Sequence, residues 1–113
     1  MIDISDGIDL FNECDFFSAH DFFEDIWMDA NSNEKEFFQG LVQISVGCYH
    51  LICGNLKGAK SQLFKGNAKL KKFEPEFNNI NLISLNKKIE LLINNINSNT
   101  IINREIPTIE LIN

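Results

Sequence analysis

The side chains best suited to chemistry lie in the segment His20-Asp-Phe-Phe-Glu24-Asp-Ile-Trp27, which forms an HxxxExxW pattern. Spacings of four and seven place His20, Glu24 and Trp27 on one face of a helix. Nearby phenylalanines make this segment strongly apolar, so we expect the imidazole and the carboxylate to turn toward a packing surface. Burying an ionisable group is costly unless the group is paired. Partners are therefore expected on a neighbouring helix.

A second polar set follows on the next predicted helix, where Gln39, Gln43 and His50 lie close to one face. A turn near residue 32 would make the two helices antiparallel neighbours, so that positions equidistant from the turn meet. Gly40 and Gly47 flank this set, although glycine inside a helix costs about 1 kcal/mol relative to alanine. We expect a bulky side chain to pack against these glycines, and the indole of the HxxxExxW pattern is the first candidate.

Two interpretations of this cluster stay open. His20, Glu24 and His50 could bind a divalent metal as a set of two histidines and one carboxylate with open positions, and Glu24 or His50 could act as a general base. However, the pattern lacks the second histidine of HExxH, and His50 falls about one turn beyond the level of His20. The other interpretation is a buried polar network in which Glu24 accepts hydrogen bonds from Gln39 or Gln43. The sequence identifies no reaction and no catalytic residue.

The elements that must position these residues are helices. Apolar residues repeat at three and four, which predicts five helices at about residues 6–13, 16–30, 34–53, 56–72 and 79–96. N-caps are expected at Ser5, Asp15, Asn33 and Asn55, and Gly54 suits the left-handed position that ends a helix. Residues 34–53 are apolar nearly all the way round, so this helix should be central.

A weak internal repeat relates residues 10–19 to residues 50–59, forty positions later. Each copy contains a helix end, a short turn, a cap and a small residue one turn into the next helix. This arrangement is typical of tetratricopeptide-like hairpins. The sequence therefore predicts a single compact all-α domain at residues 1–96, built from antiparallel hairpins around a central hydrophobic helix. Residues 97–113 are expected to form a polar linker and a short apolar tail packed on the domain.

Composition restricts the classes of function. The net charge of −6 over 113 residues argues against a general nucleic-acid binder, because such affinity depends on phosphate neutralisation. The lysines at 57, 60, 65, 69 and 72 are expected to form a solvated face. Three cysteines without CxxC spacing indicate reduced thiols. An acidic N-terminus and the lack of a long apolar run predict a cytoplasmic chain without a membrane span. Exposed phenylalanines would be compatible with a homodimer or a protein partner.

Several ordered motifs resemble domain of unknown function family 309 over about residues 7–77. They are HxxxExxW, Phe38-Gln39-Gly40-Leu41-Val42-Gln43, Tyr49-His50 and Gly54-Asn55-Leu56-Lys57-Gly58-Ala59. The resemblance implies a compact all-helical domain of bacteria and archaea in which HxxxExxW is the suspected functional motif. Some members are described as predicted metal-dependent hydrolases. Asp21 departs from the family pattern, where glutamate is common.

The resemblance and the residues together define one candidate cluster, which contains His20, Glu24, Trp27, Gln39, Gln43 and His50. We expect this cluster to form a buried network or pocket in a binding or interaction module. The alternative is a metal-dependent hydrolase that uses His20 and Glu24. The sequence names neither a ligand nor a partner.

Overall fold

The computed structural model describes residues 2–98 and 106–112. The described chain contains the helices α1 (Ser5–Asn12), α2 (Phe16–Asp29), α3 (Ser32–Ile52), α4 (Leu56–Lys71) and α5 (Leu82–Asn97). Two short strands, β1 (Glu76–Phe77) and β2 (Ile80–Asn81), form a small antiparallel sheet before α5. The predicted all-α class with five helices is confirmed, and the sheet is a minor addition.

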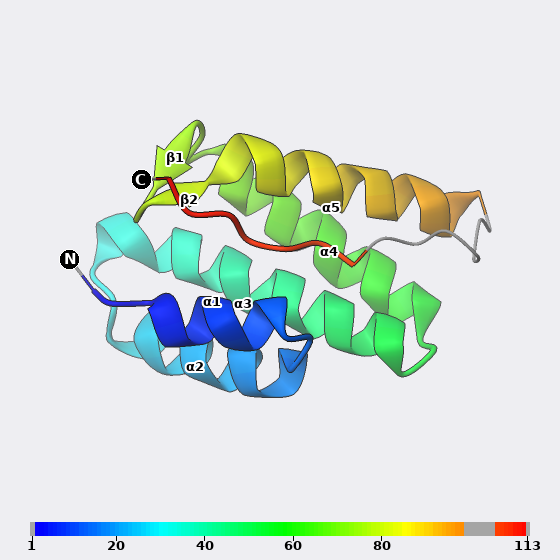
Figure 1. Ribbon diagram of the computed structural model, residues 1–113, viewed down its shortest axis with the longest axis horizontal. Coiled ribbons are helices and arrows are strands. Elements are labelled where there is room, and N and C mark those ends of the chain that lie inside the picture. Colours follow the sequence, from blue (N-terminus) through cyan, green and yellow to red (C-terminus); the bar gives the residue numbers. More distant parts are fainter. Residues whose placement is uncertain (1, 99–105, 113) are drawn as a thin grey trace.

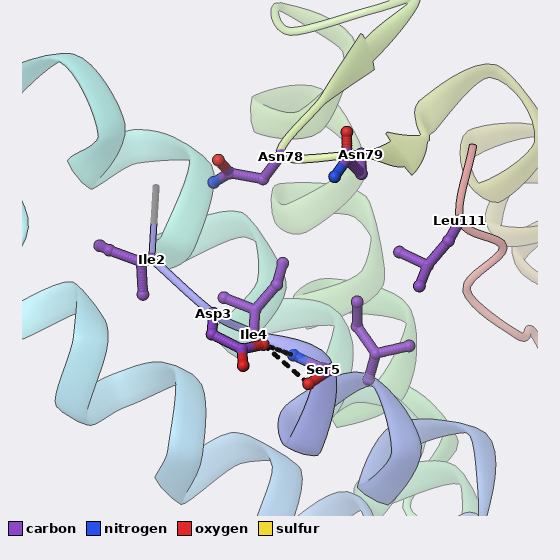
Figure 2. Close-up of a pocket in the computed structure, with 8 residues that line it drawn as sticks. Ile2, Asp3, Ile4, Ser5, Asn78, Asn79 and Leu111 are labelled. Carbon is purple, nitrogen blue, oxygen red and sulfur yellow. Dashed lines mark hydrogen bonds between the residues drawn. The ribbon is translucent and has the colours of Figure 1, made fainter. Parts of the chain in front are cut away.

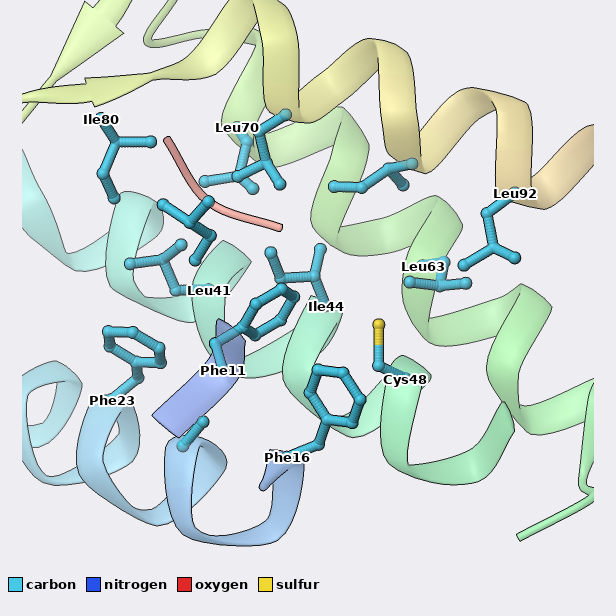
Figure 3. Close-up of a cluster of buried hydrophobic side chains, with 14 of the residues drawn as sticks. Phe11, Phe16, Phe23, Leu41, Ile44, Cys48, Leu63, Leu70, Ile80 and Leu92 are labelled. Carbon is cyan, nitrogen blue, oxygen red and sulfur yellow. The ribbon is translucent and has the colours of Figure 1, made fainter. Parts of the chain in front are cut away.

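Helix α3 is the centre of the domain, as its apolar composition predicts. It packs against α2 on one side and α4 on the other, while α1 packs on α2 and α5 packs on α4 (Figure 1). Figure 3 shows Phe11, Phe16 and Phe23 from the first two helices facing Ile44 and Cys48 of α3. Burial raises the pKa of the Cys48 thiol above its ordinary value. This thiol is therefore a packing group and not a nucleophile.

The turns before α2 and α4 have the same conformation, forty residues apart. The caps Asp15 and Asn55 each accept a hydrogen bond from the backbone N–H three residues later, at 3.3 and 3.0 Å. The backbone N–H of each cap donates to the carbonyl five residues earlier, at 2.9 and 2.8 Å. The preceding residue has positive φ in both turns, 65° at Cys14 and 82° at Gly54. The weak repeat therefore encodes one turn geometry that is used twice.

Close contact between α3 and α4 explains the glycines, and the expectation that Trp27 packs against them is wrong. A Cβ at Gly40 would lie 2.9 Å from the side chain of Leu70, and Gly47 faces α4 in the same way. A Cβ at Gly66 of α4 would lie 2.9 Å from the carbonyl oxygen of Gly40. These glycines therefore let two helix backbones approach each other, with no role in seating the indole.

Two predicted helix starts differ from the structure. Helix α1 begins at Ser5 itself, whose N–H and hydroxyl donate to Oδ1 of Asp3 at 3.0 and 2.7 Å. Asn31, and not Asn33, caps α3 by accepting from the N–H groups of Asn33 and Glu34 at 3.0 and 3.1 Å. The Asn31 amide also donates to the Glu34 carboxylate at 3.2 Å. The cap therefore lies two residues earlier than expected, and its contact with Glu34 runs through the side-chain amide of Asn31, not through the backbone N–H of a capping box.

The start of the fifth predicted helix is a hairpin. Asn78 and Asn79 have φ of 49° and 63°, the conformation required by a tight two-residue turn between antiparallel strands. Asn81 then caps α5 by accepting from the N–H of Ser84 at 3.1 Å. Two adjacent asparagines tolerate positive φ better than most residues, and this local signal outweighed the helical spacing.

The C-terminal segment lies along the domain between α1 and α5 (Figure 1). Asn12 donates to the carbonyl oxygen of Ile109 at 3.0 Å and accepts from its N–H at 2.7 Å. Leu111 forms an antiparallel bridge with Ile80. Residues 99–105, where most of the expected polar linker falls, lie outside the described residues. In the part of the chain that the structure describes, we find no helix with the length and apolar content to cross a membrane.

Candidate functional site

The first two polar residues of the HxxxExxW pattern pair along one face of α2. Nε2 of His20 lies 3.3 Å from Oε2 of Glu24. Nδ1 of the same ring lies 3.6 Å from Oδ1 of Asp21, which is too long for a hydrogen bond. The side chain of His20 is 24% exposed and that of Glu24 is 44% exposed. The expected burial of both groups is therefore not met, because α2 is an outer helix.

His20 lines an apolar hollow between α2 and α3 with a volume of about 220 Å³. The other lining residues are Phe17 from α2 and Val46, Tyr49 and His50 from α3. The ring of Phe17 lies against both neighbouring rings, with centroid distances of 5.7 Å to His20 and 5.7 Å to Tyr49. The fold thus brings the two histidines of the chain to one cavity from different helices.

The α3 side of the hollow is held by contacts at the end of that helix. Nδ1 of His50 lies 3.5 Å from the amide nitrogen of Asn55, the residue that caps α4. A Cβ at Gly58 would lie 3.1 Å from Cδ2 of His50, so glycine leaves room for the ring. A side-chain hydrogen bond with Cys53 raises the pKa of Tyr49 above its ordinary value. The phenol therefore keeps its proton at neutral pH, and its hydroxyl already has Cys53 as a hydrogen-bond partner.

The other predicted site residues do not line the hollow. Nζ of Lys35 lies 5.6 Å from the ring centroid of Trp27, a cation–π geometry that occupies the indole. Oε1 of Gln43 is buried and accepts no hydrogen bond from the described residues. Gln39 is half-buried on the same helix. The predicted hydrogen bonds from Gln39 or Gln43 to Glu24 are not formed in the described part of the chain.

The proposed metal ligands do not come together as a complete set. Within residues 2–98 and 106–112, no three His, Cys, Asp or Glu side chains lie close enough to share an ion. His20 and Glu24 supply two donors, whereas a catalytic zinc site uses three protein ligands. The described residues therefore do not supply the three protein ligands of a catalytic zinc centre.

A separate hollow of about 280 Å³ lies between the N-terminal segment and the β1–β2 turn (Figure 2). Figure 2 shows Asp3 on one side and Asn78 and Asn79 on the other. Hydrogen bonds from the backbone N–H and the hydroxyl of Ser5 lower the pKa of Asp3 from its ordinary value. Asp3, which carries the one carboxylate among the lining residues, therefore already accepts hydrogen bonds from Ser5. This hollow shares no residue with the HxxxExxW pattern.

Sequence reasoning missed three residues that line the site, namely Phe17, Val46 and Tyr49. Their spacing contained a usable signal. Phe17 lies one turn before His20, and positions 46, 49 and 50 lie on one face of α3. Spacing alone does not distinguish a buried stripe from the wall of a hollow, so the sequence did not separate these residues from the core.

The fold and the site define a small, mostly helical domain with a histidine-lined hollow between α2 and α3. A family model described as a domain of unknown function (DUF309) matches residues 4–62. The chain belongs to this family. The matched part contains α1, α2, α3 and every residue that lines the hollow, and it ends within α4, earlier than the motifs suggested. No curated protein matches the chain.

Proposed function

We propose that the chain is a binding module that receives an apolar or aromatic side chain of a partner protein in the hollow between α2 and α3. The observation that carries this proposal is the convergence of His20 and His50 on one hollow. Its remaining walls are Phe17, Val46 and Tyr49. A few polar groups placed around an apolar hollow are the usual composition of a binding site.

The size of the hollow favours a side chain over a free small molecule. Its volume of about 220 Å³ is below the roughly 300–1,000 Å³ of typical small-molecule sites. Phe17 is 54% exposed and Tyr49 is also exposed, so aromatic surface is available beside the hollow. Tyrosine is also among the residues that contribute most to protein–protein affinity. A protein partner therefore explains both the small volume and the exposed rings.

The two polar residues of the motif have different roles in this proposal. The 3.3 Å contact with Glu24 limits rotation of the His20 ring and holds it at the edge of the hollow. Glu24 is thus a positioning residue, and the imidazoles offer hydrogen bonds to the partner. Zinc-dependent hydrolysis with His20 and Glu24 would require a third protein ligand, which the described residues do not provide. The binding role is the better supported of the two.

The proposal can be tested by selecting peptides from a displayed random library against the purified full chain. We expect the recovered peptides to share an aromatic or leucine anchor. Val46→Glu should weaken their binding by about tenfold or more, as measured by fluorescence anisotropy, because it places a charge in the apolar wall. Leu91→Glu is the matched control, since Leu91 is exposed on α5. Peptides without a common anchor, or equal effects of the two substitutions, would contradict the proposal.

A further inference from the structure

Two exposed apolar side chains lie on different helices. Phe64 lies among lysines of α4, and Met28 lies beside aspartates of α2, where Lys35 also donates to the carbonyl oxygen of Met28 at 3.5 Å. Among the residues described, Phe64 of α4 and Met28 of α2 are the most exposed large apolar side chains, at 65% and 64%. A large apolar side chain exposed among polar residues is often part of a contact surface. The charges around each one indicate what that surface would bind.

The α4 face consists of Lys57, Lys60, Ser61, Phe64 and Lys65, which line a shallow hollow of about 340 Å³. All five residues are exposed. The three lysines form no ion pair within residues 2–98 and 106–112. This face is separate from the residues that line the hollow between α2 and α3.

Two lysines at the end of α4 are paired within the chain. Nζ of Lys71 lies 2.9 Å from Oε2 of Glu90, and Nζ of Lys72, just beyond the helix, lies 3.0 Å from Oε2 of Glu36. The chain therefore neutralises these two lysines, whereas Lys69 and the lysines around Phe64 form no ion pair among the described residues. The surface complementary to Phe64 and its lysines would be anionic, with an apolar side chain at its centre.

The α2 face has this complementary composition. It consists of Asp21, Asp25, Met28 and Asp29, all of which are exposed. Asp25 and Asp29 form no ion pair among the described residues, and Asp21 has only the 3.6 Å contact with His20. These four positions are spaced at 0, 4, 7 and 8, the same spacing that relates Lys57, Ser61, Phe64 and Lys65 on α4. Both sets form a stripe along one side of a helix.

We propose that the α4 face of one copy of the chain binds the α2 face of a second copy. Phe64 would pack against Met28, a favourable contact between sulfur and an aromatic ring. The lysines would lie opposite the aspartates. The net charge of −6 disfavours a nucleic acid as the occupant of the α4 face. Opposite charge, matched spacing and an apolar centre on each face together favour a second copy.

This contact joins two different surfaces, so a dimer formed through it still has one free α2 face and one free α4 face. Association of this type is open-ended and continues beyond a dimer. A single helix face buries less area than the roughly 1,600 Å² of a standard interface. We therefore expect weak assembly whose average size rises with concentration and falls with salt.

Sedimentation velocity of the full chain tests this inference over roughly 10 µM to 1 mM protein. At low salt, the average mass should rise above the 12.9 kDa monomer. Close to 1 M salt it should return to the monomer, because the Debye length shortens from about 10 Å at 0.1 M to about 3 Å. A chain that stays monomeric throughout this range at low salt overturns the proposal.

Charge reversal identifies the faces. Lys57→Glu with Lys65→Glu, and separately Asp25→Lys with Asp29→Lys, should each reduce association about tenfold or more. All four positions are exposed, and circular dichroism would verify that each variant is folded. The control Lys87→Glu, on α5 and outside both faces, should leave association unchanged.

Mixing the two charge-reversed variants separates self-association from other partners. The acidic α2 face of one variant can still bind the basic α4 face of the other, so the equimolar mixture should recover association that neither variant shows alone. A mixture that stays monomeric overturns the proposal. So does binding of a DNA duplex through the lysines without any self-association.

Discussion

Replacing Gly66 by alanine tests how closely α3 and α4 approach each other. The added Cβ would lie 2.9 Å from the carbonyl oxygen of Gly40 and 3.1 Å from the backbone nitrogen of Ile44. These are backbone atoms of α3, which cannot rotate away as the end of a side chain can. Relief of the overlap therefore requires the two helices to move apart.

The expected effect on the free energy of unfolding is the sum of two opposing contributions. Alanine in place of glycine stabilises a helix interior by about 1 kcal/mol. Overpacking a well-packed core costs about 1–3 kcal/mol, and contacts with backbone atoms favour the upper end. We expect a net loss of about 2 kcal/mol for Gly66→Ala. Gly40→Ala should be closer to neutral, because its nearest contacts are side-chain atoms of Leu70 at 2.9 Å.

Urea unfolding followed by far-UV circular dichroism measures this difference. Ala68→Gly provides the calibration, because Ala68 is exposed on the same helix and its replacement reports helix propensity without packing. It should cost about 1 kcal/mol. If Gly66→Ala instead gains as much stability as Ala68→Gly loses, the close approach of the two helices does not constrain this position, and the packing argument fails.

Two further predictions concern the tail and the acid stability of the domain. Asn12→Ala removes both hydrogen bonds to Ile109 and should lower the free energy of unfolding by about 1–3 kcal/mol. Hydrogen exchange at the backbone amide of Ile109 should become faster. Unchanged exchange would contradict docking of the tail through Asn12. Hydrogen bonds from Lys71 and Asn67 lower the pKa of Glu90 in the folded protein from its ordinary value of 4.5. The Glu90 carboxylate therefore stabilises the fold above pH 4.5, and this contribution is lost as the pH falls through the lower pKa of the folded state. Glu90→Gln should therefore lower the free energy of unfolding by no more than about 1 kcal/mol at neutral pH, because the side chain is 40% exposed and solvent screens the pair with Lys71. Near pH 2 the same substitution should have little effect. Equal losses in urea unfolding at both pH values would contradict this assignment.

The helices were predictable because their signals are local. Apolar spacing places each helix, and Asp15, Gly54 and Asn55 end or begin helices through contacts within a few residues. The pair of His20 and Glu24 is also local, since positions four apart on a helix face each other. The all-α class and its five helices therefore follow from interactions that the chain makes with its near neighbours.

The predicted start of α3 shows where local signals are ambiguous. Both Asn31 and Asn33 are chemically able to cap a helix. The structure uses Asn31, whose side chain also pairs with Glu34. A second acceptable cap two residues away was enough to misplace the boundary. The hairpin at Asn78 and Asn79 was missed for a related reason, since apolar spacing favoured a helix there.

The candidate site depended on tertiary structure. His20 and His50 are both visible in the sequence, but their meeting depends on how α2 and α3 are rotated about their axes. That rotation is set by packing of the whole core, including the contact of α3 with α4 through Gly40 and Gly66. Spacing along one helix specifies which residues share a face, and only the neighbouring helices decide whether that face is buried, forms the wall of a hollow or meets solvent.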